Sequence, residues 1–155
     1  DINTRGAYLC SKTCLPHLKK SLNPHILNLS PPFNMKSKWF VNFTSYTMSK
    51  FGMSMCVLGM SEEYKKYNIA VNALWTKTAI NTAALAMLGG FVTPEQCRKP
   101  EIVSDAAFVI LSKNSRDCSG NFFIDEDVLR EAGENDFEKY AVKPGSKLFS
   151  DLYLD

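Results

Sequence analysis

The chain has 155 residues, of which 45% are hydrophobic and 22% are charged, so it is long enough for one globular domain with a sizeable core. Its net charge of +2 is small and no basic run exceeds two residues, which argues against a nucleic-acid-binding surface. No apolar stretch reaches about 18 residues, so we expect no transmembrane helix.

The chain begins at Asp1, without a methionine or a signal-peptide pattern, which is typical of a fragment or a processed piece. Its five cysteines are an odd number and form no Cys-x-x-Cys pair, which favours a reducing intracellular compartment.

Cys10, Cys14 and His17 can share a helix face. A metal site needs a fourth ligand and closer pairing, so we predict small buried side chains and no metal.

The first predicted element is a helix over residues 3–20. Ala7, Cys10, Cys14 and Leu18 recur near helical spacing, and two lysines follow them, as is common at the end of a helix. A short apolar run then predicts a buried strand over residues 25–29. It ends at a Ser-Pro-Pro sequence, after which we expect a loop up to residue 44.

The longest predicted helix covers residues 45–66 and carries much apolar surface before a charged end. A second apolar run directly after it predicts a strand over residues 69–74. A strand, a long helix and a strand in succession indicate a right-handed crossover between parallel strands.

Further along, we expect short helices over residues 79–88 and 101–113 and a third strand over 120–125. The alternation of strands and helices predicts an α/β fold with a mostly parallel sheet. Residues 1–125 would form this domain. Residues 126–155 are acidic and then punctuated by proline and glycine, so we expect a peripheral, solvated extension.

Tyr46 and Lys50 stand four residues apart at the start of the long helix, which places them on one helix face. An ammonium near a phenol favours the phenolate, so we expect the pKa of Tyr46 to fall from about 10 towards neutral. A proton donor with such a pKa suits the reduction of a carbonyl. Ser30 and Trp75 follow two parallel strands directly, so we expect them near Tyr46 at the ligand-binding edge of the sheet.

Several segments, in the right order, resemble the short-chain dehydrogenase/reductase family. They are Asn3 within residues 1–6, the strand that ends at Ser30, the Tyr-x-x-x-Lys of Tyr46 and Lys50, and residues 71–74. The resemblance covers about the first 125 residues. It implies a Rossmann-like, doubly wound parallel sheet of which this chain is the C-terminal portion.

The resemblance also implies roles for these side chains. Tyr46 would exchange a proton with the substrate oxygen, and Lys50 would lower the pKa of Tyr46 and bind the nicotinamide ribose. Asn3 would anchor a water relay, and Ser30 would contact the substrate oxygen. Hydride would come from a nicotinamide cofactor, NADP rather than NAD, although NAD is not excluded.

The chain departs from the family pattern at two positions. The catalytic serine of the family lies about one residue after Ser30, where this chain has a proline; Ser45 is a poorer substitute, because it points elsewhere on the helix. The loop after the second strand normally opens with Pro-Gly, and here it reads Thr76-Lys77. Thr78 and Thr82 are candidates for contact with the nicotinamide amide or the diphosphate.

The glycine-rich phosphate loop of the family lies upstream of this sequence, so we expect weak cofactor binding by this chain and an exposed sheet edge. We expect a small apolar carbonyl or alcohol as substrate, with a lipid-derived compound as one candidate. Its wall would be built from five apolar side chains: Trp39, Phe40, Trp75, Leu85 and Met87. The resemblance implies a homo-oligomer formed through the Tyr46 helix and a peroxisomal or mitochondrial setting.

A second interpretation stays open. The proline after Ser30, the missing Pro-Gly and the absent phosphate loop also suit a truncated or degenerate relative without catalytic activity. Such a protein would at most associate with other subunits through its long helix.

Overall fold

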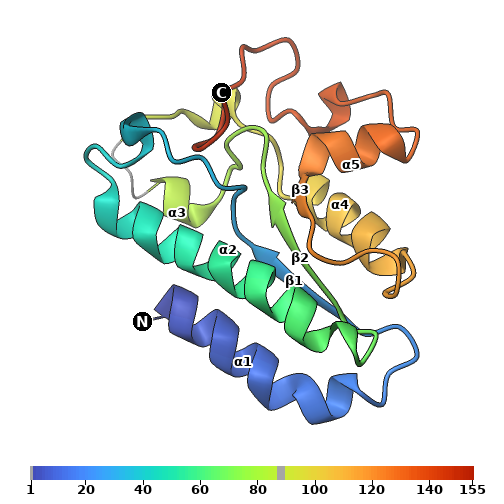
Figure 1. Cartoon of the computed structure of the whole chain (residues 1–155). Helices are drawn as coiled ribbons and strands as arrows, with labels where there is room; N and C mark the ends of the chain where they lie inside the picture. Colours follow the sequence, from blue (N-terminus) through green and yellow to red (C-terminus); the bar gives the residue numbers. More distant parts are fainter. Residues whose placement is uncertain (1, 87–89) are drawn as a thin grey trace.

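The computed structural model describes residues 2–86 and 90–155 (Figure 1). Its helices, short 3-10 turns and strands are, in chain order, α1 (Ile2–Leu18), β1 (His25–Leu29), η1 (Ser37–Trp39), α2 (Thr44–Lys65), β2 (Ala70–Trp75), α3 (Ala83–Ala86), η2 (Pro94–Gln96), α4 (Glu101–Ser112), β3 (Phe122–Ile124), α5 (Asp125–Glu131) and η3 (Glu138–Tyr140). None of these described helices has both the length and the apolar content that crossing a membrane requires.

The predicted alternation of strands and helices is confirmed, and most boundaries agree within two residues. The predicted strand over 25–29 is β1, and the predicted helix over 45–66 is α2. The predicted helix over 79–88 is shorter: α3 begins only at Ala83, and residues 87–88 lie outside the described part of the chain.

The three strands form one parallel sheet in the order β1-β2-β3. His25 pairs with Ala70 and Leu29 with Leu74, so the carboxyl ends of β1 and β2 lie at the same edge. Helices α1 and α2 cover one face, and α4 and α5 cover the other (Figure 1). Within the described residues β1 has no partner on its outer side, as expected from the sequence.

Strand β2 is the centre of the molecule, because every one of its six residues is buried. Successive side chains point to opposite faces of the sheet. Val71 and Ala73 therefore pack against α2, while Leu74 packs with Ile102 and Ala106 of α4. A strand covered on both faces reads as a continuous apolar run, which explains why the sequence pattern identified it.

The expectation of a solvated extension after residue 125 is wrong. Residues 125–131 form helix α5, and Val128 and Leu129 belong to the core. Glu126 is only 6% exposed, and it forms an ion pair with the equally buried Arg98 at 2.5 Å. The acidic composition of this segment reflects a buried ion pair and a helix start, where carboxylates interact favourably with free N–H groups.

The cysteines of α1 also differ from expectation. Cys10 and Cys14 are exposed rather than buried, because α1 turns this face away from α2. Among the described residues no three histidine, cysteine or acidic side chains gather as metal ligands would.

Helices α1 and α2 approach closely at Gly52, and this contact yields a stability prediction. A Cβ at Gly52 would lie 2.1 Å from Thr4 Oγ1, whereas a Cβ at Gly59 of the same helix would meet nothing within 4 Å. We expect Gly52→Ala to destabilise the chain by about 1 to 3 kcal/mol through overpacking. Gly59→Ala, the matched control, should be stabilising by up to about 1 kcal/mol through helix propensity. Urea unfolding of both variants measures the difference, and equal effects would refute the packing argument.

Candidate active site

Three of the predicted site residues, Tyr46, Lys50 and Trp75, meet at the carboxyl ends of β1 and β2. Helix α2 starts at this edge and carries Tyr46 in its first turn and Lys50 in its second. Lys50 Nζ donates a hydrogen bond of 3.1 Å to the carbonyl oxygen of Leu29, the last residue of β1. It also lies 5.2 Å from the ring centroid of Trp75 at the end of β2, and 6.0 Å from that of Tyr46. The ammonium therefore joins the helix to both strand ends.

The predicted fall in the pKa of Tyr46 is wrong. Partial burial, together with the nearby Tyr153 and Asp151, raises this pKa to about 12. Burial also lowers the pKa of Lys50, and Asp151 opposes that change. The ammonium of Lys50, 6.0 Å from the ring centroid, does not outweigh the desolvation of a phenolate. Tyr46 is thus a neutral phenol at neutral pH, which is the form that donates a proton.

Ser30 lies at the predicted edge but points into the protein. It is 0% exposed, and its hydroxyl has no hydrogen-bond partner among the described residues. It is therefore neither open to a substrate in this structure nor a side-chain cap of the strand end. The next residue, Pro31, accepts a hydrogen bond of 2.7 Å from Ser54 of α2, which fixes the chain as it leaves β1.

Asn3 is brought next to the Tyr46 helix. Its amide donates to Ser49 Oγ at 3.1 Å, and that hydroxyl in turn donates to the carbonyl oxygen of Tyr46 at 2.8 Å. The hydroxyl of Thr4 donates to the backbone oxygen of Ser49. The start of α1 is thus anchored to Ser49, which stands between Tyr46 and Lys50. Asn3 is linked to the backbone of Tyr46 through the hydroxyl of Ser49.

The loop after β2 is held by side chains rather than by the Pro-Gly of the family. The hydroxyl of Thr76 donates to a carboxylate oxygen of Asp151. The backbone N–H of Lys77 donates to Asp125 Oδ1 at 2.9 Å, and its ammonium reaches Glu126 at 3.3 Å. These contacts anchor the loop at its first two residues, Thr76 and Lys77.

The two threonines proposed for cofactor contact differ in environment. Thr78 is only 9% exposed and its hydroxyl has no partner among the described residues, so a buried hydrogen-bonding group is available there. Thr82 is exposed just before α3.

The predicted apolar wall is divided between two clusters. Trp39 and Phe40 pack with the buried Trp75 and Phe51 around the ring of Tyr153. Leu85 belongs to a separate cluster with Ala79, Val92 and Cys97, and Met87 lies outside the described residues.

Sequence analysis missed the contribution of residues 149–155, which we call the C-terminal strap. Tyr153 is 2% exposed, and its hydroxyl lies 3.2 Å from Thr47 Oγ1 of α2. The signal was the apolar run Leu152-Tyr153-Leu154 within a polar tail.

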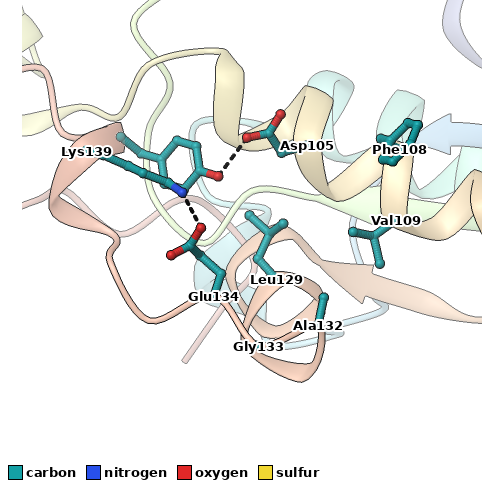
Figure 2. A pocket seen from close by; sticks show the side chains of 9 residues that line it. Asp105, Phe108, Val109, Leu129, Ala132, Gly133, Glu134 and Lys139 are labelled. Atoms are coloured by element: carbon teal, nitrogen blue, oxygen red, sulfur yellow. Dashed lines mark hydrogen bonds and ion pairs between the residues drawn. The ribbon is translucent and has the colours of Figure 1, made fainter.

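A cavity of about 380 Å³ lies elsewhere, between α4, α5 and η3, and none of the predicted site residues lines it (Figure 2). Its polar groups are already paired with one another. Tyr140 donates to Asp105 at 2.7 Å, and Lys139 forms an ion pair with Glu134. We therefore place the candidate active site at the sheet edge.

The parallel sheet and its covering helices define a Rossmann-like α/β fold. A family model described as short chain dehydrogenase matches residues 1–88, and the chain belongs to this family. It is 59% identical over 154 residues to hydroxysteroid dehydrogenase-like protein 2 of Xenopus laevis, covering 99% of this chain and 36% of that protein. The human protein of the same name is 55% identical, with 100% and 37% covered. The chain thus spans about a third of the length of these relatives.

Solved structures agree with this assignment. A putative dehydrogenase from Xanthomonas campestris superposes with a TM-score of 0.94 at 44% identity, over 99% of this chain and 56% of that one. A 7α-hydroxysteroid dehydrogenase complexed with NADH and 7-oxo glycochenodeoxycholic acid gives a TM-score of 0.62 at 25% identity, over 79% of this chain and 50% of that one.

The buried carboxyl group of Asp125 yields a pH prediction. It is 0% exposed, one of its oxygens has no partner among the described residues, and burial raises its pKa from 3.8 to about 6. Between these values the folded chain holds a proton that the unfolded chain has lost, so wild-type stability falls as pH rises through this window. We expect the free energy of unfolding of Asp125→Asn, relative to wild type, to rise by up to about 3 kcal/mol from about pH 4 to about pH 7.

Urea unfolding at a series of pH values measures this change. Asp127→Asn is the matched control, because Asp127 stands in the same helical turn but is exposed. A difference between Asp125→Asn and wild type that does not vary with pH would contradict the prediction.

Proposed function

We propose that this chain supplies the proton-transfer half of a nicotinamide-dependent oxidoreductase that interconverts a carbonyl and a secondary alcohol. The position of Lys50 carries this proposal, because its ammonium bridges the end of β1 and the rings of Tyr46 and Trp75. A bound nicotinamide would supply the hydride to the carbonyl carbon.

The protonation state of Tyr46 supports the reductive direction. The neutral phenol donates its proton to the oxygen that becomes negative as the carbonyl is reduced. The phenolate left behind is stabilised by the ammonium of Lys50, which stands on the same helix face. In the opposite direction the phenol would first have to lose a proton against a pKa of about 12.

The cofactor fits two groups of this chain. Lys50 offers a cationic donor for a ribose hydroxyl, and Thr78 offers an unpaired hydroxyl at the end of β2 for the nicotinamide amide. We assign NADP from the family resemblance, with NAD as the alternative. The diphosphate would depend on a glycine-rich loop that this sequence does not contain.

The proposed substrate is an apolar carbonyl compound or alcohol, with a lipid-derived compound as one candidate. The partly exposed rings of Trp39 and Phe40 beside α2 support an apolar site.

A peroxisomal or mitochondrial setting belongs to the same proposal and rests on the family resemblance alone. Fractionation of cells that express the tagged protein tests this setting, and recovery in neither organelle would refute it.

Cofactor binding to this chain tests the central proposal. We expect calorimetry to detect NADPH binding that Lys50→Ala weakens by about tenfold, since a hydrogen bond to a charged group is lost. Lys65→Ala is the matched control, because Lys65 is an exposed lysine of the same helix. Binding that Lys50→Ala and Lys65→Ala affect equally would contradict the assigned site.

A non-catalytic relative is the second candidate, and the complete burial of Ser30 favours it. It predicts no NADPH binding by a folded wild-type chain. The same titration therefore separates the two functions.

A second copy of the chain is the proposed partner in either case. Met48, Met55 and Leu58 are each more than half exposed, and they lie on one face of α2. We expect sedimentation velocity to show a dimer that Met55→Lys shifts towards monomer, because the charge would be buried at the interface. Phe108→Lys is the control, since Phe108 is also an exposed apolar side chain but lies on α4. A monomeric wild type would refute this interface.

A further inference from the structure

The C-terminal strap is built into the loop after β2. Ala79 donates a backbone hydrogen bond to Phe149 at 2.9 Å, and Asp151 donates one to Lys77 at 3.1 Å. Thr78 and Ser150 form an antiparallel bridge between these two bonds. The strap therefore pairs with the loop as a short additional strand would, although the two segments are about seventy residues apart.

The same strap also reaches the loop after β1 and the start of α2. The ring of Tyr153 packs against Trp39, Phe51 and Trp75, with centroids 5.2 to 5.8 Å apart. At its end, Asp155 forms ion pairs with Lys36 at 2.6 Å and with a second lysine of that loop. The strap thus joins the three segments that surround the candidate active site.

Asp151 stands where these contacts meet the candidate catalytic pair. One carboxylate oxygen accepts from the hydroxyl of Thr76, and the other accepts from the N–H of Leu152 at 2.7 Å. The indole N–H of Trp75 donates to the carbonyl oxygen of Leu152 at 3.0 Å, and Lys50 lies over the Trp75 ring. The anion is consequently fixed beside the same tryptophan that the ammonium contacts.

We propose that Asp151 is a positioning residue of this site, which holds the loop after β2 through Thr76 and places a negative charge beside Trp75, the residue that the Lys50 ammonium contacts. The titratable groups near Lys50 are Tyr46 on its own helix, whose ring centroid lies 6.0 Å from the ammonium, and Asp151 on the strap. Asp151 is the acidic member of this set, and it opposes the effect of burial on the pKa of Lys50.

This arrangement explains why the chain has a threonine at residue 76, where the family pattern has a proline. A proline at residue 76 would stiffen the loop but has no hydroxyl to donate. Thr76 replaces that local stiffness with a hydrogen bond to a distant carboxylate. The geometry of the loop therefore depends on the strap.

Two variants separate the role of the hydrogen bond from that of the charge. Asp151→Asn removes the charge, so we expect Lys50 to titrate at a lower pH than in the wild type in NMR of labelled lysine. The same variant should accelerate exchange of the Ala79 amide by about tenfold, because the loop opens more often. Thr76→Val loses only the hydrogen bond, so it should accelerate exchange while the titration of Lys50 stays unchanged.

Asp155→Asn is the matched control, because it removes an acidic side chain from the same strap but leaves Thr76 and Lys50 untouched. Titration of Lys50 in Asp151→Asn that equals that in Asp155→Asn would overturn the charge role. Unchanged exchange of Ala79 in Thr76→Val would overturn the positioning role, and this variant keeps the test decisive if Asp151→Asn does not fold.

Any effect of Asp151 on cofactor binding rests on the proposed function. We expect Asp151→Asn to weaken NADPH binding by about tenfold, and Asp155→Asn to leave it unchanged. The titration and exchange measurements use the chain without cofactor. A wild type that binds no NADPH but shows the expected titration and exchange would refute the proposed function alone.

Discussion

Parallel pairing of β1 with β2 is the constraint on which the rest of the structure depends. Two parallel strands require a crossover, and the 22 residues of α2 provide it along one face of the sheet. The crossover has to begin at the carboxyl edge, so the first turns of α2 lie beside the ends of both strands. Tyr46 and Lys50 therefore reach the edge where ligands bind in such sheets, and Lys50 can bond the last carbonyl of β1.

The elements of the sheet could be predicted from the sequence because their signals are local. The apolar run of β1, the helical spacing of apolar residues in α2 and the continuous apolar run of β2 are each contained in one short stretch of sequence. The placement of the Tyr46–Lys50 pair followed from the same connectivity. The pKa of Tyr46 did not, because Tyr153 and Asp151 of the strap, from the other end of the chain, add to the effect of partial burial. No local pattern encodes that contact, and the short apolar run around Tyr153 was its only trace.

Carboxylates take a role at this edge that the family pattern assigns to a rigid Pro-Gly. Asp125 holds the backbone of Lys77 from the end of β3, and Asp151 holds Thr76 from the strap. Both acids are buried, which makes their hydrogen bonds strong and their charged forms costly. The loop after β2 is consequently fixed by tertiary contacts, so its geometry is coupled to the folding of α5 and of the strap.

The unpaired outer edge of β1 couples the stability of the fold to the binding of a further strand. Within the described residues this strand has backbone N–H and C=O groups that no neighbouring strand satisfies. Any strand that binds there, from the same polypeptide or from another, binds the folded sheet and not the unfolded chain. By mass action it would stabilise α2, β2 and the Lys50 edge together. The apparent stability of the site would then depend on the concentration of the strand that binds to this edge.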